Sequence, residues 1–467
     1  MQAQPLEVKP ARWWTLAAWF LIWSLVAAFF YRPATGIINW YTTVIWTMSF
    51  GVGIVGIIGA IKGRRLIKEQ PDPGDPVTSD ERVNVVITTV GKYTALGALS
   101  RVVASAPAMA THLTNCHIHI LTDEGCEAMA EIERLALSIN ATLVVVPEDY
   151  QTPQLTEFKG RALQYYTDQL IAKYGGIDNI PENEWNYYLD DDTAVAECTS
   201  RKYATFIAAN GPDNPERKHL AQGILAYRRQ DAENLWLWRA DAIRTFDDMG
   251  RFPATTASGT PRQGLHGENA LWRARVDAAI GWDFGPKELV EDSHKALVFC
   301  HRYPGRSAWV PARCFGAPPT SAWDFSGKQR GRWSWGMMGL SLNRSIPLRE
   351  RLFILHNMFV WATGIFQPVL IVAFISFMVG DFNVAPVTPW LAPFWVVSVS
   401  YTYWAYWEGL RQNALASGRT SASLWDKLLL IPGIAYFSLL EGWGGTYGAA
   451  KHFLNVKRTF DGVAKPV

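Results

Sequence analysis

The chain is poor in cysteine and lacks the short motifs of several enzyme classes. Its 467 residues include five cysteines with no CxxC pair, so neither a disulfide framework nor a zinc ribbon is indicated. Neither a GxxxxGK[ST] phosphate loop nor an HExxH zinc motif occurs. The formal charge of +2 gives no basis for binding nucleic acid. What the chain does have is a hydrophobic fraction of 49%, concentrated toward both ends.

Two uncharged apolar runs near the N-terminus predict a transmembrane hairpin. Residues 13–31 and 40–61 are each close to the roughly 20 residues that cross the hydrocarbon core as a helix. A cleavable signal peptide is the alternative for the first run, but no small-residue cleavage site follows it and a second run comes next. Lys9, Arg12 and the basic cluster at 62–68 place both ends of the hairpin in the cytosol. We therefore expect the central region to face the cytosol.

Three further apolar runs, at residues 352–379, 389–407 and 428–447, predict C-terminal membrane helices. If all three cross, the basic tail lies outside, which conflicts with the positive-inside rule. Pro432 and the glycines after it can instead break the last run into a re-entrant element, which needs protein or a cavity around it. Both courses stay open. Glu441, inside this run, is expected either to line a lipid-access cavity or to make a helix-packing contact.

Strand-like and helical runs alternate after a linker rich in proline and aspartate. The linker is 69–79, the expected strands are 83–90, 117–124 and 142–149, and the helices between them are 94–110 and 126–138. Strands separated by helices imply an α/β domain with a Rossmann-like, mostly parallel sheet. Ligands of such sheets bind beyond the carboxyl ends of the strands, which is where Asp123 lies. The alternative for Asp123 is a capping role in a turn.

The segment Tyr187-Tyr-Leu-Asp-Asp-Asp-Thr193 runs out of an apolar strand into three successive carboxylates. Asp190 and Asp192 are expected on the same side, because side chains alternate along a strand. Two hard oxygen ligands on one edge suit Mg²⁺ or Mn²⁺. The alternative is a solvated turn.

A second acidic element is Glu291-Asp292, which follows two apolar residues and precedes a helical run. Acids at a helix N-terminus complement the helix dipole by about 0.3–1 kcal/mol, so a purely structural role is one interpretation. The other is that Asp292 acts as a general base. Taken alone, the pair does not discriminate between them.

The third element is Gln329-Arg-Gly-Arg-Trp333. Arg332 is suited to hold a phosphate by two parallel hydrogen bonds, and Trp333 to stack on a sugar ring. Residues 325–348 can equally form an interfacial helix with basic and aromatic side chains at the lipid headgroups. The two interpretations are compatible.

The combination is more specific than its parts. A DxD motif is followed by an ED pair ending 100 residues after Asp192, and a QxxRW motif begins 37 residues after Asp292, all between apolar ends. This arrangement resembles the membrane-bound, inverting family 2 glycosyltransferases of GT-A fold, the group that holds the cellulose and hyaluronan synthases. The resemblance implies a cytosolic GT-A domain inserted between N- and C-terminal transmembrane helices.

Residues 158–165, 246–250, 290–292 and 318–325 are also similar to the egghead-type β-1,4-mannosyltransferases, over roughly residues 82–340. Those enzymes transfer mannose from GDP-mannose to a glucosyl lipid. The resemblance therefore implies a nucleotide-sugar donor, a lipid-linked sugar acceptor and contact with membrane lipids.

The resemblance also implies roles for individual residues. Asp123 contacts the nucleotide base, Lys159 or Arg161 supports the nucleotide and phosphate, Asp190 and Asp192 hold the donor and its Mg²⁺ or Mn²⁺, Asp292 is the catalytic base, Arg332 binds the donor, and Trp333 and Glu291 bind the acceptor. The chain departs from the family in reading LDDDT where LDEET is usual. The stretch 264–285, which should face the acceptor, has the length expected for the family but not the expected residues.

The expected organisation is that of a multi-pass membrane protein with a cytosolic catalytic domain. It comprises a transmembrane hairpin (1–68), a GT-A domain (80–320), interfacial helices with QxxRW (321–350), transmembrane helices (351–450) and a tail (451–467). A processive polysaccharide synthase using a UDP-sugar is the nearest rival function, because it shares QxxRW. A transporter is the rival from another class, but the apolar runs are almost free of charge.

Overall fold

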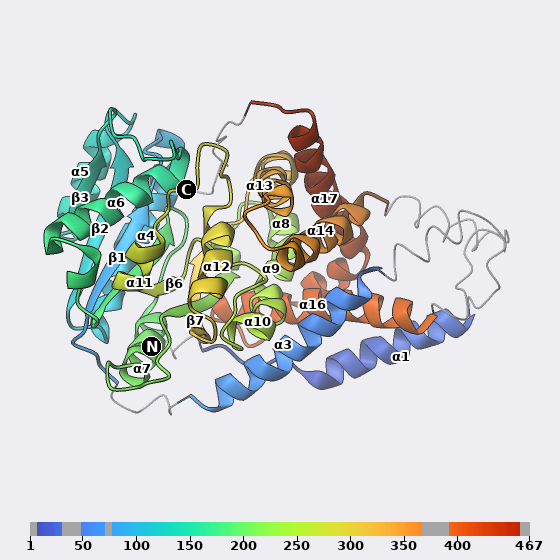
Figure 1. Ribbon diagram of the computed structural model, residues 1–467. Coiled ribbons are helices and arrows are strands. Elements are labelled where there is room, and N and C mark those ends of the chain that lie inside the picture. The colour runs from blue at the N-terminus through green and yellow to red at the C-terminus, as the bar shows by residue number, and fades with distance from the viewer. Residues whose placement is uncertain (1–6, 30–47, 71–76, 367–391, 458–467) are drawn as a thin grey trace.

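The computed structural model describes residues 7–29, 48–70, 77–366 and 392–457 (Figure 1). A seven-stranded sheet lies on one side of the molecule, and long helices from both ends of the chain gather on the other. The mixed α/β fold predicted for the central region is thereby confirmed.

The sheet is mostly parallel, as predicted. Its strands are β1 (Arg82–Thr88), β2 (Cys116–Asp123), β3 (Thr142–Val146), β4 (Glu184–Asp190), β5 (Leu220–Tyr227), β6 (Ala270–Arg273) and β7 (Ser307–Gly316), in the order β3-β2-β1-β4-β6-β5-β7. Strand β6 runs antiparallel to β4 and β5, and the other neighbours pair in parallel. The three strands expected from the sequence are β1, β2 and β3. The antiparallel β6 was not foreseen.

Helices cover both faces of this sheet, which explains why β1 reads as a nearly continuous apolar run. The covering helices are α4 (Leu96–Ser105), α5 (Met129–Ser138), α6 (Phe158–Tyr174), α7 (Glu197–Ala209), α11 (Ala274–Ile280) and α12 (Glu291–Arg302), with short 3₁₀ turns η1 (Tyr93–Ala95), η2 (Ala106–Thr111), η3 (Ile177–Asn179) and η4 (Arg229–Asp231). Val85 of β1 packs in one core with α4, α5 and α7. Its neighbour Val86 packs in another with α6 and α12. Alternate residues of one strand thus fill two cores.

The remaining helices form the second side of the molecule (Figure 1). They are α1 (Trp13–Phe29), α3 (Phe50–Lys68), α8 (Leu235–Ala240), α9 (Ala242–Asp247), α10 (Arg251–Thr256), the π-helical turn η5 (Asp324–Arg330), α13 (Gly331–Leu342), α14 (Leu348–Ala362), the 3₁₀ turn η6 (Thr363–Phe366), α16 (Ala392–Ala416) and α17 (Leu424–Phe453). The buried Glu408 of α16 binds Arg12 and Arg411, which fastens the start of α1 to α16. The part of α16 that follows the predicted span 389–407 is thus a buried, charged core helix.

The predicted set of transmembrane helices is not confirmed. Among the described residues, one helix, Leu424–Phe453, is long and apolar enough to cross a membrane, and α1 is apolar but shorter. The predicted run 40–61 lies partly outside the described residues, and so do residues 367–379 of the run 352–379 and the start of the run 389–407. The multi-pass arrangement, its orientation and the domain boundaries stay predictions.

Helix α17 is continuous through Pro432, so the break that the glycines suggested does not occur. Their function is close packing instead. A β-carbon at Gly448 would lie 2.1 Å from the carbonyl oxygen of Gly331, and one at Gly444 would lie 2.4 Å from Cβ of Arg330. Small residues thus let α17 approach η5 and α13 at backbone distance. This contact fixes the position of the QxxRW segment.

Candidate active site

A cavity of about 440 Å³ lies at the carboxyl ends of β1, β2 and β4, within the usual size for a small-molecule site. It is lined by nearly all the predicted site residues, namely Asp123, Lys159, Asp190, Asp192, Glu291, Asp292, Arg332 and Trp333. Arg161, which does not line it, lies behind Asp123 and donates from Nη1 to Oδ1 of Asp123 at 2.6 Å. The structure thus brings Lys159 to the cavity and gives Arg161 a place supporting Asp123.

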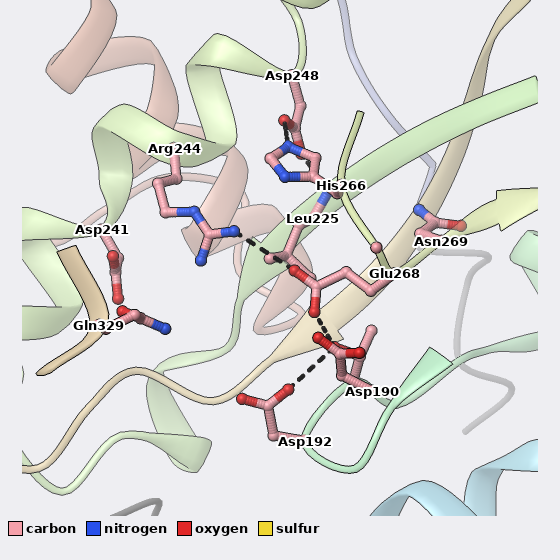
Figure 2. Close-up of polar contacts among 12 residues, drawn as sticks. Asp190, Asp192, Leu225, Asp241, Arg244, Asp248, His266, Glu268, Asn269 and Gln329 are labelled. Atoms are coloured by element: carbon pink, nitrogen blue, oxygen red, sulfur yellow. Dashed lines mark hydrogen bonds and ion pairs between the residues drawn. The ribbon is translucent and has the colours of Figure 1, made fainter. Parts of the chain in front are cut away.

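Three carboxylates meet at the centre of this cavity. Asp190, Asp192 and Glu268 each offer an oxygen within 4.8 Å of the others (Figure 2). Strand β4 ends at Asp190, and a turn brings Asp192 back to the site. The two side chains are therefore close because of this turn, and the predicted reason, alternation along a strand, is wrong. The middle acid, Asp191, accepts a hydrogen bond from Oγ1 of Thr89 at 2.8 Å, which ties the turn to the end of β1.

Glu268 was missed by the sequence analysis, although it lies in the stretch 264–285. Because β6 is antiparallel, the residues before it arrive at the carboxyl end of β4, where Ala270 pairs with Tyr188. Asn269 between them has a left-handed backbone (φ 54°), which asparagine tolerates better than most residues. Its amide nitrogen donates to the carbonyl oxygens of Ile224 and Ala312, both at 3.0 Å. This anchor holds Glu268 toward the aspartates.

The electrostatics of the cluster favour a cation. Burial raises the pKa of Glu268 to about 7, and the nearby Asp190 carboxylate adds to this effect. Figure 2 shows the Glu268 carboxylate between the two aspartates and Arg244, whose Nη2 lies 3.4 Å from Oε1 of Glu268. Three hard oxygen donors crowded in a low-dielectric site form a donor set that fits a divalent ion such as Mg²⁺ or Mn²⁺.

Lys159, on α6, connects the carboxylate cluster to Glu291 and Asp292. Its ammonium forms an ion pair with Asp190 and also lies 3.3 Å from the carbonyl oxygen of Gly267. Burial lowers the pKa of Lys159, but the surrounding carboxylates raise it by more, so the net shift is upward and the side chain stays charged. A fixed positive charge therefore lies between the two acidic elements.

Asp292 occupies the first turn of α12, so the helix-end interpretation is correct and does not compete with a catalytic one. Its Oδ1 accepts a hydrogen bond from the backbone N–H of Ser293 at 2.7 Å. Burial raises the pKa of Asp292 above its ordinary value, although Lys159 opposes the shift. The neighbouring Glu291 has its pKa raised to about 7 by burial and by the charge of Asp292. A raised pKa makes a carboxylate a stronger base.

Gly267 separates Lys159 from Asp292. A β-carbon there would lie 2.8 Å from Nζ of Lys159 and 3.3 Å from Oδ2 of Asp292. Asp292 therefore lies close to the backbone of Gly267, the residue before Glu268, and glycine avoids crowding there.

The QxxRW segment closes the cavity from the helical side. Arg332 donates from Nη1 to the carbonyl oxygen of Leu289 at 3.3 Å and lines the cavity. Arg330 is instead fully buried and pairs with Asp241 and Glu441, so it holds η5 in place. Gln329 and Arg330 end the π-helical turn η5, a form often found at functional sites, and Gly331 begins α13.

Two more groups at the cavity were not predicted. The Arg244 guanidinium lies 4.5 Å from the ring centroid of Trp333 and donates to Oη of Tyr227 at 2.6 Å. His266 forms an ion pair with Asp248 and lines the same cavity. Both come from segments without a recognisable motif, and the nearest signal was the conserved-length stretch 264–285 that holds His266.

The chain is similar in part to known glycosyltransferases. Residues 185–407 match the model of Glycosyl transferase family group 2. Beta-1,4-mannosyltransferase egh of Drosophila melanogaster is 24% identical over 257 residues, which cover 54% of this chain and 51% of that protein. Beta-1,4-mannosyltransferase bre-3 of Caenorhabditis elegans is 24% identical over 224 residues, covering 47% and 46%. The matched region thus spans about half the length of these curated relatives.

Among solved structures, the mannosyltransferase PcManGT from Pyrobaculum calidifontis, in complex with GDP-Man and Mn²⁺, aligns with a TM-score of 0.46 at 12% identity. The alignment covers 89% of this chain and 99% of that one. The family match covers β4 to β7, Asp190, Asp292 and the QxxRW segment. Residues 185–407 are therefore similar to a family 2 glycosyl transferase domain.

Proposed function

We propose that the protein is an inverting glycosyltransferase of GT-A fold that transfers mannose from GDP-mannose to a glucosyl lipid in β-1,4 linkage, at the cytosolic membrane face. One observation carries the proposal. A buried carboxylate, Asp292, lies across Gly267 and Lys159 from the cluster of Asp190, Asp192 and Glu268, and both elements line one cavity. This closeness supports a role for Asp292 as the base and for the cluster as the site of an anionic leaving group.

The leaving-group side of the cavity would hold the diphosphate of the donor. Asp190, Asp192 and Glu268 would bind Mg²⁺ or Mn²⁺, which neutralises charge on the departing diphosphate. Lys159 and Arg332 add fixed positive charge near it. Asp123, at the end of β2 and supported by Arg161, is placed to contact the nucleotide base.

The acceptor side is served by Asp292. The oxygen of an acceptor hydroxyl bonds to the anomeric carbon while the bond from that carbon to the diphosphate oxygen breaks, and the hydroxyl proton goes to the Asp292 carboxylate. One displacement of this kind inverts the anomeric centre, so an α-linked donor yields a β-linked product. The raised pKa of Asp292 favours the proton transfer.

Donor and acceptor are proposed from the relatives, whose names give β-1,4-mannosyl transfer. A membrane location is supported by the apolar helix Leu424–Phe453, which packs directly on α13 and so adjoins the site. A lipid-linked sugar would reach such a site by diffusion within the bilayer.

The test of the base is Asp292→Asn in the full chain. We expect the turnover of GDP-mannose with a glucosyl lipid to fall by about 10²–10⁴-fold, while GDP affinity stays near that of the wild type. Asp178→Asn, at an exposed position in η3, is the control. An Asp292→Asn enzyme with wild-type turnover would refute the assignment.

The donor and the chain length of the product need a second experiment. The purified protein is offered GDP-mannose, UDP-glucose and UDP-N-acetylglucosamine with a glucosyl lipid, and products are sized by mass spectrometry. We expect one mannosyl addition from GDP-mannose. Turnover with a UDP-sugar alone would overturn the mannose assignment, and a ladder of products would favour the processive synthase.

A further inference from the structure

A second cavity, of about 420 Å³, adjoins the first on the helical side of the molecule. The two share Arg244, His266, Asp292 and Trp333 in their walls. Any molecule in the second cavity therefore has one end at the base and beside the Trp333 ring. This is the position from which a nucleophile would approach a donor in the first cavity.

Polar groups without a protein partner lie in the wall of this second cavity. Within the described parts of the chain, the side-chain amides of Gln263 and Asn357 make no hydrogen bond, although both line the cavity. Both amides are only half-buried, so they are accessible to a molecule in the cavity. The hydroxyl of Tyr401, a residue only 4% exposed, is in contrast buried without a partner in the described chain. Buried polar groups are normally satisfied, so this hydroxyl in a cavity wall indicates a polar ligand.

Both amides belong to elements that contact the active site directly. Gln263 precedes Gly264, where a β-carbon would lie 2.9 Å from Oγ of Ser293, the residue next to Asp292. Asn357 precedes Met358, which packs in one cluster with Val290 and Trp333. The two amides thus reach the cavity from a loop and from α14, on either side of the base.

The part of the wall contributed by α16 and α17 is mixed. Val399 of α16 and Ile434 and Ala435 of α17 are apolar, whereas Thr402, Ser438 and Glu441 of the same helices are polar. Helix α17 is also the helix that is long and apolar enough to cross a membrane. A cavity with hydrogen-bonding groups near the base and hydrocarbon along a membrane-type helix matches an amphiphile, with its head group at Asp292.

We propose that this second cavity is the acceptor subsite, that it takes a sugar head group with a hydrocarbon tail, and that Gln263 and Asn357 recognise the sugar hydroxyls. The inference rests on the proposed function and adds to it the location of the acceptor and the residues that select it. The tail lies along Ala435 and Val399. Neither Gln263 nor Asn357 lines the first cavity, so their effect should be confined to the acceptor.

The head-group part is tested with GDP-mannose and methyl, octyl and dodecyl β-glucosides. We expect Gln263→Ala and Asn357→Ala each to raise the KM for octyl glucoside about five- to tenfold, the effect of losing one hydrogen bond, with the KM for GDP-mannose unchanged. Gln151→Ala, an exposed amide without a described contact, is the matched control. An unchanged acceptor KM in both cavity variants would overturn this part.

The tail part is tested by narrowing the cavity with Ala435→Phe. The wild type should bind dodecyl glucoside more tightly than methyl glucoside, and the variant should lose about tenfold of that preference while its KM for methyl glucoside stays constant. Tight GDP binding by the variant shows that the fold is intact. Equal loss for both glucosides would refute the placement of the tail. A wild type that transfers mannose to no glucoside overturns both this inference and the proposed function, whereas an active wild type with insensitive variants overturns the inference alone.

Discussion

Gly267→Ala tests whether the closeness of Asp292 to the carboxylate cluster matters, and it replaces no charged residue. The new β-carbon would lie 2.8 Å from Nζ of Lys159, whereas ordinary contacts begin at 3.4 Å, so the ammonium must retreat by roughly 0.6 Å. Because that atom is the end of a flexible side chain, the cost in stability should be about 1 kcal/mol or less. The retreat strains its ion pair with Asp190, and the β-carbon also crowds Oδ2 of Asp292 at 3.3 Å.

Activity should respond far more than stability. Misplacing catalytic groups by about 1 Å can reduce a rate by about 10²-fold, and we expect a loss of this order in kcat/KM for the glucosyl lipid. The assay combines steady-state transfer from GDP-mannose with a thermal unfolding curve. Gly211→Ala is the control, since a β-carbon there meets nothing within 4 Å. A Gly267→Ala enzyme with a kcat/KM within threefold of the wild type would refute the reasoning that position 267 must lack a side chain.

Three further predictions concern single side chains. Glu268→Gln removes one carboxylate from the cluster and should raise the Mn²⁺ concentration for half-maximal turnover by about tenfold or more, measured in a metal titration. Arg330→Met leaves Asp241 and Glu441 without their buried partner and should destabilise the protein by about 3–5 kcal/mol in a denaturant titration. Glu291→Gln should flatten the dependence of stability on pH. Because the pKa of Glu291 is raised from 4.5 to about 7 on folding, its stabilising contribution is present below the unfolded pKa and is lost as the pH rises through 7.

Each of these has a matched control or a contrary outcome. A Glu268→Gln enzyme with an unchanged metal requirement would exclude Glu268 from the cation site. Lys328→Met, which removes a half-exposed ion pair with Asp324, should cost only about 1 kcal/mol or less, and an equal loss at Arg330 would contradict the argument from burial. For Glu291, the stability is measured from melting curves recorded between about pH 5 and pH 8. The free energy of unfolding should fall more steeply with rising pH in the wild type than in the variant, and each unit of pKa shift corresponds to about 1.4 kcal/mol. Parallel pH profiles would contradict the prediction.

Three strands of the sheet could be predicted because each one depends on a short stretch of neighbouring residues. Strands β1, β2 and β3 are short apolar runs separated by helical ones, and this alternation predicted a parallel sheet with Asp123 at its carboxyl edge. The motifs around Asp190, Asp292 and Arg332 were recognisable as residue types that chemistry requires. Each alone had a structural alternative of comparable weight.

The parts that were missed depend on contacts between distant segments. Glu268 enters the cluster because β6 runs antiparallel beside β4, and pairing direction leaves no trace in a four-residue strand. Helix α17 stays continuous through Pro432 and through Gly444 and Gly448, which pack on η5 and α13. Local helix propensity does not contain such packing. Glu441 makes the helix-packing contact considered for it, with Arg330. It also lines the second cavity, but the access of lipid to that cavity stays a proposal.

The amino-acid sequence by itself determined the α/β sheet, the resemblance to family 2 glycosyltransferases and the side chains available for chemistry, because these follow from hydrophobic period and from short motifs. Only the tertiary structure decided that Asp292 lies across Gly267 and Lys159 from a cluster of three carboxylates. Only the tertiary structure decided as well that Arg332 lines the cavity while Arg330 is buried behind it. The physical reason is that catalysis needs separations of a few ångströms between residues about 100 positions apart, and such separations are set by how strands pair and helices pack.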